Sequence, residues 1–205
     1  MNKLRCLLVF VATFLASSFP LAAQTAAPAD ATATAVPVPS EPSARLSPHE
    51  TISIRLGRSL VTVTYGRPLS KKVGTTEVRK VWGALVPWGQ VWRMGSDEAT
   101  TLITQVPLVI GRTDVPAGAY TLCMFPDEKG TTKLIINKQI GQWGIPYTPA
   151  IQANELARVD MKKDTLNTQV DQFTIALVAD PATGGATLKA FWETTQYSVG
   201  ITVKK

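Results

Sequence analysis

The residues best suited to bind a ligand are concentrated between Tyr65 and Thr100. This irregular, glycine-rich stretch of 36 residues contains three of the five tryptophans and an adjacent pair of acidic residues. Loops carried by a rigid β scaffold are the usual location of functional sites, and ligand pockets commonly combine aromatic walls with a few polar groups. The candidate ligand-binding residues are Arg67, Trp88, Trp92, Arg93, Asp97, Glu98, Thr100 and, further along the chain, Trp143.

Two interpretations of this cluster are open. In the structural one, Arg93 and Glu98 form an ion pair that holds the intervening turn, and the tryptophans fill the core while their ring N–H groups donate to backbone carbonyls. In the functional one, Arg67 and Arg93 form a fork for a carboxylate, a sulfate or sugar hydroxyls, and Trp88 or Trp92 supplies a stacking face.

A second aromatic segment, 142–147, contains Trp143 and Tyr147. It is interpreted either as a loop packed over the end of the domain or as the far wall of the same pocket. The cluster as a whole therefore predicts a packed cap or a binding pocket.

Catalytic chemistry receives little support from the sequence. Adjacent side chains on an extended chain point to opposite sides, so Asp97 and Glu98 cannot together flank a substrate. Glu98 with Glu155 or Asp160 could form the carboxylate pair of a glycosidase-type hydrolase, but nothing in the sequence brings them together. We therefore predict no catalytic residue and keep a cell-envelope hydrolase that uses Glu98 or Asp97 as an alternative.

The supply of metal ligands and nucleophiles is equally small. The chain has one histidine, His49, and two cysteines, of which Cys6 lies in the leader described below. The other, Cys123, lies in a strongly apolar segment, which predicts a buried and unreactive thiol. Zinc sites usually combine several histidines and cysteines, so we predict no metal site and no cofactor.

The elements that must position these residues show the period-two alternation of β-strands. Ile52, Ile54 and Leu56 share one face, for example, and Gly57-Arg58-Ser59 then turns the chain into the next run. The predicted strands are 51–56, 60–65, 100–106, 108–110, 119–125, 133–137, 157–161, 172–179, 186–192 and 197–203, and the only candidate helix is a short one within 77–85. Many short strands separated by turns predict an all-β fold, an antiparallel β-sandwich that is jelly-roll-like or barrel-like, with one short helix at most.

The N-terminus has the order of a secretory signal peptide. A basic start at 1–5 is followed by the apolar run 6–19 and by small residues that end at Ala23. We therefore predict a signal peptide at 1–23, a flexible tether rich in Ala, Pro and Thr at 24–45, and one folded domain at 46–205. This predicts export to the periplasm or the extracellular space, with no transmembrane segment left after cleavage.

The charge pattern does not indicate a nucleic-acid partner. The net charge of +6 falls to +4 when Lys3 and Arg5 leave with the signal peptide, and the remaining basic residues are scattered. Proteins that bind nucleic acids usually carry a dense basic patch or stripe. The expected partner is a small polar ligand or a glycan.

Several motifs together resemble the DUF2911 family, a domain of unknown function found in exported bacterial proteins. The motifs are Ser47-Pro48, Tyr65-x-Arg67-Pro68, Trp82-Gly83-x-Leu85-Val86-Pro87, Val91-Trp92-Arg93-x-Gly95-x-x-Glu98-Ala99-Thr100, Pro116-x-Gly118-x-Tyr120-x-Leu122 and Trp143-Gly144. The resemblance extends from about Leu46 to the C-terminus and implies an exported all-β domain, without implying an activity. At Ser96-Asp97 the chain departs from the more familiar Ala-Asn of the family.

These observations lead to three functional hypotheses. The preferred one is a non-catalytic binding module for a small polar ligand, a glycan or an envelope partner, because tryptophan and arginine cluster without acid–base machinery. The others are the hydrolase described above and a purely structural role in the envelope.

Overall fold

Alternating apolar residues build the first hairpin of the domain. The computed structural model describes residues 45, 47–72 and 74–205, so the predicted signal peptide and nearly all of the predicted tether lie outside the described residues. Strand β1 (His49–Leu56) pairs with β2 (Ser59–Gly66), and Val61, Val63 and Tyr65 of β2 are buried. One face of the hairpin is therefore committed to the core, as the alternation predicts.

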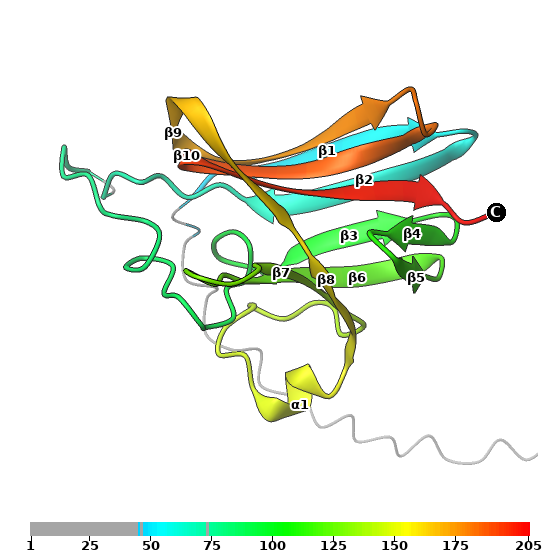
Figure 1. The fold of residues 1–205 in the computed structure, drawn as a ribbon. Coiled ribbons are helices and arrows are strands. Elements are labelled where there is room, and N and C mark those ends of the chain that lie inside the picture. The colour runs from blue at the N-terminus through cyan, green and yellow to red at the C-terminus, as the bar shows by residue number, and fades with distance from the viewer. Residues whose placement is uncertain (1–44, 46, 73) are drawn as a thin grey trace, which may run out of the picture. The chain divides into compact units, whose positions relative to one another are not determined.

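Two antiparallel sheets enclose the core, and no closed barrel forms (Figure 1). The six-stranded sheet has the order β1-β2-β3-β6-β7-β8, with β3 at Thr100–Thr104, β6 at Gly118–Phe125, β7 at Lys133–Asn137 and β8 at Glu155–Asp160. The four-stranded sheet has the order β5-β4-β10-β9, with β5 at Thr113–Val115, β4 at Leu108–Ile110, β10 at Gly185–Val203 and β9 at Lys162–Asp180. The predicted all-β sandwich is confirmed.

The last two strands are longer than the sequence indicates. Only Met161 separates β8 from β9, so the chain leaves one sheet and continues directly into the other. The two strands predicted at 186–192 and 197–203 are one strand, β10, with register shifts on either side of Glu193, which has a φ of 52°. A bulge of this kind interrupts the alternation of inward-facing and outward-facing residues. The sequence therefore suggests two separate strands where the structure has one.

The expectation of one short helix at most is confirmed, but the candidate stretch within 77–85 is not the helix. That stretch forms turns and two isolated bridges, Lys71 to Val78 and Trp82 to Val86. Gly83 adopts a φ of 82°, which a right-handed helix does not allow. The single helix among the described residues is α1 (Pro149–Gln152), whose N-cap Thr148 accepts a hydrogen bond from the Ile151 N–H. None of the described helices has the length and apolar character needed to span a membrane.

Candidate functional site

Two long connections between neighbouring strands of the six-stranded sheet form the site. Residues 67–99 join β2 to β3, and residues 138–154 join β7 to β8. The first connection is fixed to the sheet by Trp92, whose backbone exchanges hydrogen bonds of 2.8 and 2.7 Å with Met124 of β6. The two connections meet where the Ala99 N–H donates to the carbonyl of Gln142 over 3.2 Å.

Two neighbouring hollows lie at these connections, and together they are called the groove below. The hollows, of about 320 and 690 Å³, share Leu85, Trp92 and Ile145 as walls. The first hollow adds Leu69, Trp192 and the charged residues Arg79, Arg93 and Asp97. The second adds the apolar residues Pro87, Val91, Phe125 and Pro146 together with the polar residues Gln90, Tyr147, Gln152 and Arg158. Hollows of this size match those that hold small ligands in other proteins.

Trp92 gives the groove a rigid aromatic wall. Its ring stacks on Trp192 at a centroid distance of 5.7 Å and meets Phe173 and Trp82 edge-on at 4.9 and 6.0 Å. The two partner indoles are themselves fixed, because the Trp82 ring N–H donates to the Trp192 carbonyl and the Trp192 ring N–H donates to the Asp171 carbonyl. Trp82 and Trp192 are thus core residues with satisfied N–H groups, as the structural interpretation predicts. Trp92 and Trp192 also line the groove.

Trp88 lies outside both hollows of the groove. It stacks on Trp82 at 6.1 Å, and Lys163 Nζ lies 5.7 Å from its ring centroid. The structure therefore places Trp88 on the outer side of the aromatic cluster.

The predicted ion pair between Arg93 and Glu98 is wrong. Arg93 Nη1 donates instead to the carbonyls of Asp97, at 2.7 Å, and Trp143, at 3.3 Å, and its guanidinium carbon lies 5.9 Å from the Trp143 ring centroid. Burial lowers the pKa of Arg93, and the charges of Asp97 and Glu98 oppose this effect without reversing it. Within the described residues, neither Nε nor Nη2 of Arg93 makes a hydrogen bond. Arg93 is therefore a half-buried cation that contacts no carboxylate of the described residues.

Glu98 is turned to the other side of the loop, toward the lead-in of β1. Its carboxylate accepts from Arg45 Nε at 2.8 Å and from Arg45 Nη2 at 2.5 Å, and it lies 2.8 Å from His49 Nε2. Burial opposes ionisation, but the hydrogen bonds and the charges of Arg45 and His49 outweigh it and lower the pKa of Glu98. The reason for the turn is the backbone, because Met94 and Asp97 both adopt left-handed conformations, with φ of 52° and 63°.

Asp97 and Thr100 support this loop from within. The Asp97 side chain is buried and accepts the Ser47 N–H at 3.3 Å. Thr100 is fully buried, and its hydroxyl donates to the Met94 carbonyl at 2.7 Å. These contacts hold the left-handed residues in place and thereby position Arg93.

Arg67 lies apart from Arg93 and does not line the groove. Its guanidinium pairs with Glu50 at 3.1 Å and donates to the Phe173 carbonyl and the Thr174 hydroxyl at 3.3 and 2.9 Å. It therefore ties the end of β2 to β9, and the predicted fork of Arg67 and Arg93 does not form.

The sequence interpretation missed most of the groove wall. Arg79, Leu85 and Ile145 lie in irregular segments without a period, so only their neighbourhood to the tryptophan cluster could have indicated them. Of the second aromatic segment, Tyr147 lines the larger hollow, and Trp143 contributes the carbonyl that anchors Arg93.

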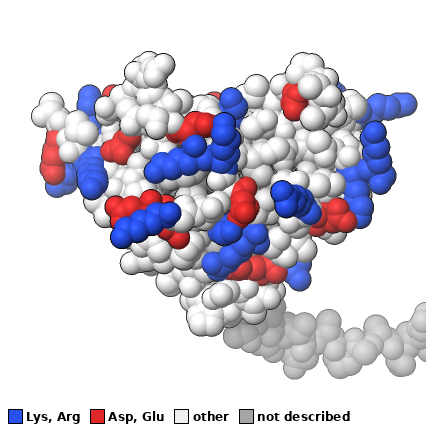
Figure 2. Space-filling view, in the orientation of Figure 1, with Lys and Arg blue, Asp and Glu red and all other residues white. Residues whose placement is uncertain are grey.

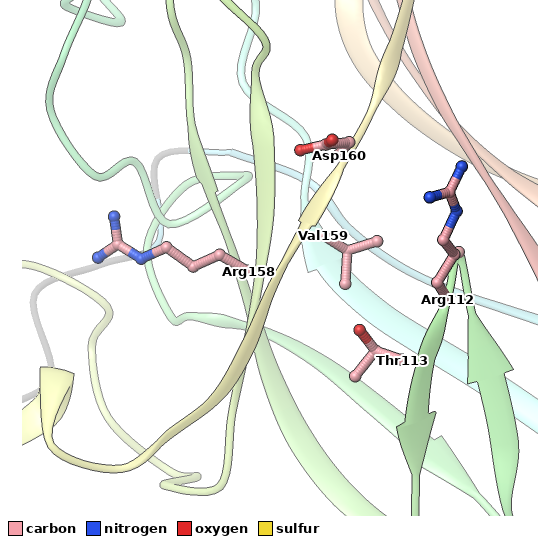
Figure 3. Close-up of a pocket in the computed structure, with 6 residues that line it drawn as sticks. Arg112, Thr113, Arg158, Val159 and Asp160 are labelled. Atoms are coloured by element: carbon pink, nitrogen blue, oxygen red, sulfur yellow. The ribbon is translucent and has the colours of Figure 1, made fainter.

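A third hollow, also of about 320 Å³, lies between the edge strand β8 and the β4–β5 hairpin (Figure 3). The side chains of Val159 on β8 and Thr113 on β5 lie between these two strands, whereas Arg158 extends to the opposite side of β8. A Cβ atom at Gly111 would come within 2.5 Å of Val159, so the two elements are already in close contact. Its lining contains no aromatic residue, and we regard it as the gap between two sheet edges.

The described part of the chain offers few residues for metal binding or for nucleophilic chemistry. No group of three or more His, Cys, Asp and Glu side chains there is arranged to hold a metal ion. Cys123 is fully buried, and burial followed by the charge of Glu155 raises the pKa of its thiol to about 12, which confirms the prediction of a buried thiol. On the face shown in Figure 2, basic and acidic side chains are interspersed.

The fold and the groove define the class of protein: an antiparallel β-sandwich that carries an aromatic, arginine-containing groove at two long inter-strand connections. A family model described as "Protein of unknown function (DUF2911)" matches residues 47–201, and the chain belongs to this family. No curated protein and no solved structure matches the chain significantly.

Proposed function

We propose that this chain is an exported, non-catalytic binding module whose ligand occupies the groove at the two connections. The observation that carries the proposal is Arg93, a half-buried guanidinium that is anchored to two carbonyls and contacts no carboxylate in the part of the chain that the structure describes. Removing a charged group from water is unfavourable unless a partner compensates, and a polar or anionic ligand group would be that partner. The leader predicted at 1–23 supports export to the periplasm or the extracellular space.

The hydrolase alternative receives less support from the geometry. A general acid needs a raised pKa, whereas the pKa of Glu98 is lowered by the groups around it. The two carboxylates suggested as partners for Glu98 are engaged elsewhere: Glu155 with Arg158 at 2.8 Å, and Asp160 with Lys133. Asp97 is buried against the Ser47 N–H.

The test is a thermal-shift screen of the mature chain against sugars, carboxylates, sulfates and amphiphiles. We expect at least one class to raise the melting temperature of the wild type and to have a smaller effect on Arg93→Gln. Arg58→Gln is the matched control, because Arg58 is exposed in the β1–β2 turn and does not line the groove. If no class shifts the wild type, the binding proposal falls and the structural role gains support.

Export is tested separately by expressing the full chain in a bacterium. We expect it in the periplasm or the medium with Gln24 as its first residue. Recovery from the cytoplasm with the leader intact would contradict this part of the proposal.

A further inference from the structure

The groove has an uneven distribution of charge along its length. In the first hollow, the ionisable lining groups are Arg79, Arg93 and Asp97. In the second hollow, the one charged lining residue is Arg158, and it is already paired with Glu155 at 2.8 Å. Among the described residues that line the groove, positive charge without a contacting carboxylate is therefore found at the first end only.

Both arginines of the first hollow are held in fixed orientations. Arg79 donates from Nε to the Ser70 carbonyl at 3.3 Å and from Nη2 to the Leu69 carbonyl at 2.8 Å. Arg93 is held by the carbonyls of Asp97 and Trp143. Asp97 is the only acid on this lining, and it accepts the Ser47 N–H. Guanidinium groups that are oriented before binding lose little conformational entropy when they donate hydrogen bonds to an oxyanion.

Exposed apolar side chains gather around the groove, although Gln90, Gln152 and Arg158 also line its second hollow. Eight large hydrophobic side chains are exposed in the described chain, and six of them lie on the two connections: Leu69, Val78, Leu85, Ile140, Trp143 and Ile145. Three of these six line the groove, with exposed fractions of 38% for Leu69, 38% for Leu85 and 46% for Ile145. Exposed apolar side chains that gather around a groove mark a surface that an apolar group covers.

We propose, on the basis of the binding function above, that the ligand is a free amphipathic anion, namely an apolar chain or ring system that ends in a carboxylate. The carboxylate binds at Arg93 and Arg79, and the apolar part passes between Leu85, Trp92 and Ile145 into the larger hollow. A neutral glycan could accept hydrogen bonds from the two guanidinium groups but would leave their positive charge uncompensated, and a cationic amphiphile would be repelled by them.

The experiment is a titration of the mature wild-type chain, followed by tryptophan fluorescence and by calorimetry. The probes are octanoate, decanoate and dodecanoate below their micelle concentrations, with acetate, decyltrimethylammonium and maltohexaose for comparison. We expect saturable binding of the long carboxylates, with an affinity that rises about two- to fourfold per methylene group, and no binding of acetate or of the cation.

Ile145→Asp should weaken decanoate binding at least tenfold, because it places a negative charge on the shared apolar wall of the two hollows, where the alkyl chain of the anion would pass. Ile103→Asp is the matched control: Ile103 is 48% exposed on β3, does not line the groove, and its change should leave the affinity unchanged. Arg93→Gln should also weaken decanoate, and since it removes a structural contact, its fold is checked by circular dichroism.

Each remaining outcome has a defined meaning. Equal binding of decanoate and decyltrimethylammonium, or an equal effect of the two aspartate variants, would overturn the amphipathic-anion proposal. Saturable binding of maltohexaose alone, sensitive to Ile145→Asp, would overturn it while the binding function stands. Co-sedimentation with phosphatidylglycerol vesicles without binding of monomeric decanoate would identify a membrane surface and also overturn it. If no probe binds and the ligand screen is also negative, both proposals fall.

Discussion

Replacing Gly144 with alanine is the sharpest test of how Arg93 is positioned. Gly144 is buried, has a φ of 93°, and follows Trp143, whose carbonyl accepts from Arg93. A Cβ atom at this position would lie 2.7 Å from Cβ of Arg93 and 3.2 Å from Cα of Ala99. One of these groups must move, and a movement of the 142–147 segment would withdraw an anchor of the guanidinium.

The expected loss of folding free energy in Gly144→Ala has two separable parts. An alanine in a left-handed conformation costs about 1–2 kcal/mol of folding free energy. Overpacking of a filled region adds about 1–3 kcal/mol. Gly141→Ala isolates the first part, because Gly141 has a similar φ of 82° and no atom within 4 Å of the position of a Cβ.

The assay is urea unfolding of both variants and of the wild type, followed by tryptophan fluorescence. We expect Gly144→Ala to lose about 1–3 kcal/mol more than Gly141→Ala, and to bind groove ligands more weakly while Gly141→Ala binds like the wild type. Equal losses of stability would refute the close contact of Gly144 with Arg93. Unchanged binding by a destabilised Gly144→Ala would show that the Trp143 carbonyl does not position the guanidinium.

Three further predictions concern the rest of the domain. Phe173→Ala should reduce the free energy of unfolding by about 3–5 kcal/mol, since the ring is fully buried against Tyr65 and Trp92; a loss below about 1 kcal/mol in urea unfolding would contradict this packing. The thiol of Cys123, with its pKa raised to about 12, should react with a thiol reagent only after unfolding, so rapid labelling of the native chain would contradict its burial. Because the pKa of Glu98 is lowered in the folded state, the stability that Glu98 contributes should be present above its unfolded pKa of about 4.3 and be lost as the pH falls through the folded value. The difference in melting temperature between wild type and Glu98→Gln should therefore narrow between about pH 6 and pH 3, and a constant difference would contradict the contacts with Arg45 and His49.

The strands that could be predicted are those in which one face is buried. Val61, Val63 and Tyr65 of β2 are buried and alternate with Thr62 and Thr64, which are not, so period two is visible in the sequence. Strand β5 was not predicted because only Val115 of its three residues, Thr113–Val115, is buried, so the sequence shows no apolar alternation there. The N-terminal half of β9 was missed because its residues are largely exposed and polar, which resembles a loop in the sequence.

The partner of Glu98 could not be predicted, and the reason lies in the backbone between Arg93 and Glu98. Proximity in sequence suggests that the two side chains meet, but the left-handed turns at Met94 and Asp97 direct them to different neighbours. Glu98 meets Arg45, which precedes it by 53 residues, and Arg93 meets the carbonyl of Trp143, which follows it by 50. The groove could not be predicted for the same reason, because most of its lining residues come from two connections that lie far apart in the sequence.

This arrangement links the lead-in of the domain to the groove through neighbouring residues of one loop. The Ser47 N–H and Arg45 hold Asp97 and Glu98, and the carbonyl of the same Asp97 holds Arg93. A loop held on one side by the lead-in and on the other by the 142–147 segment has little freedom to move Arg93 when a ligand arrives. We therefore expect the groove to be largely formed before binding, so that its selectivity comes from the charge and length of the ligand rather than from closure of the loops.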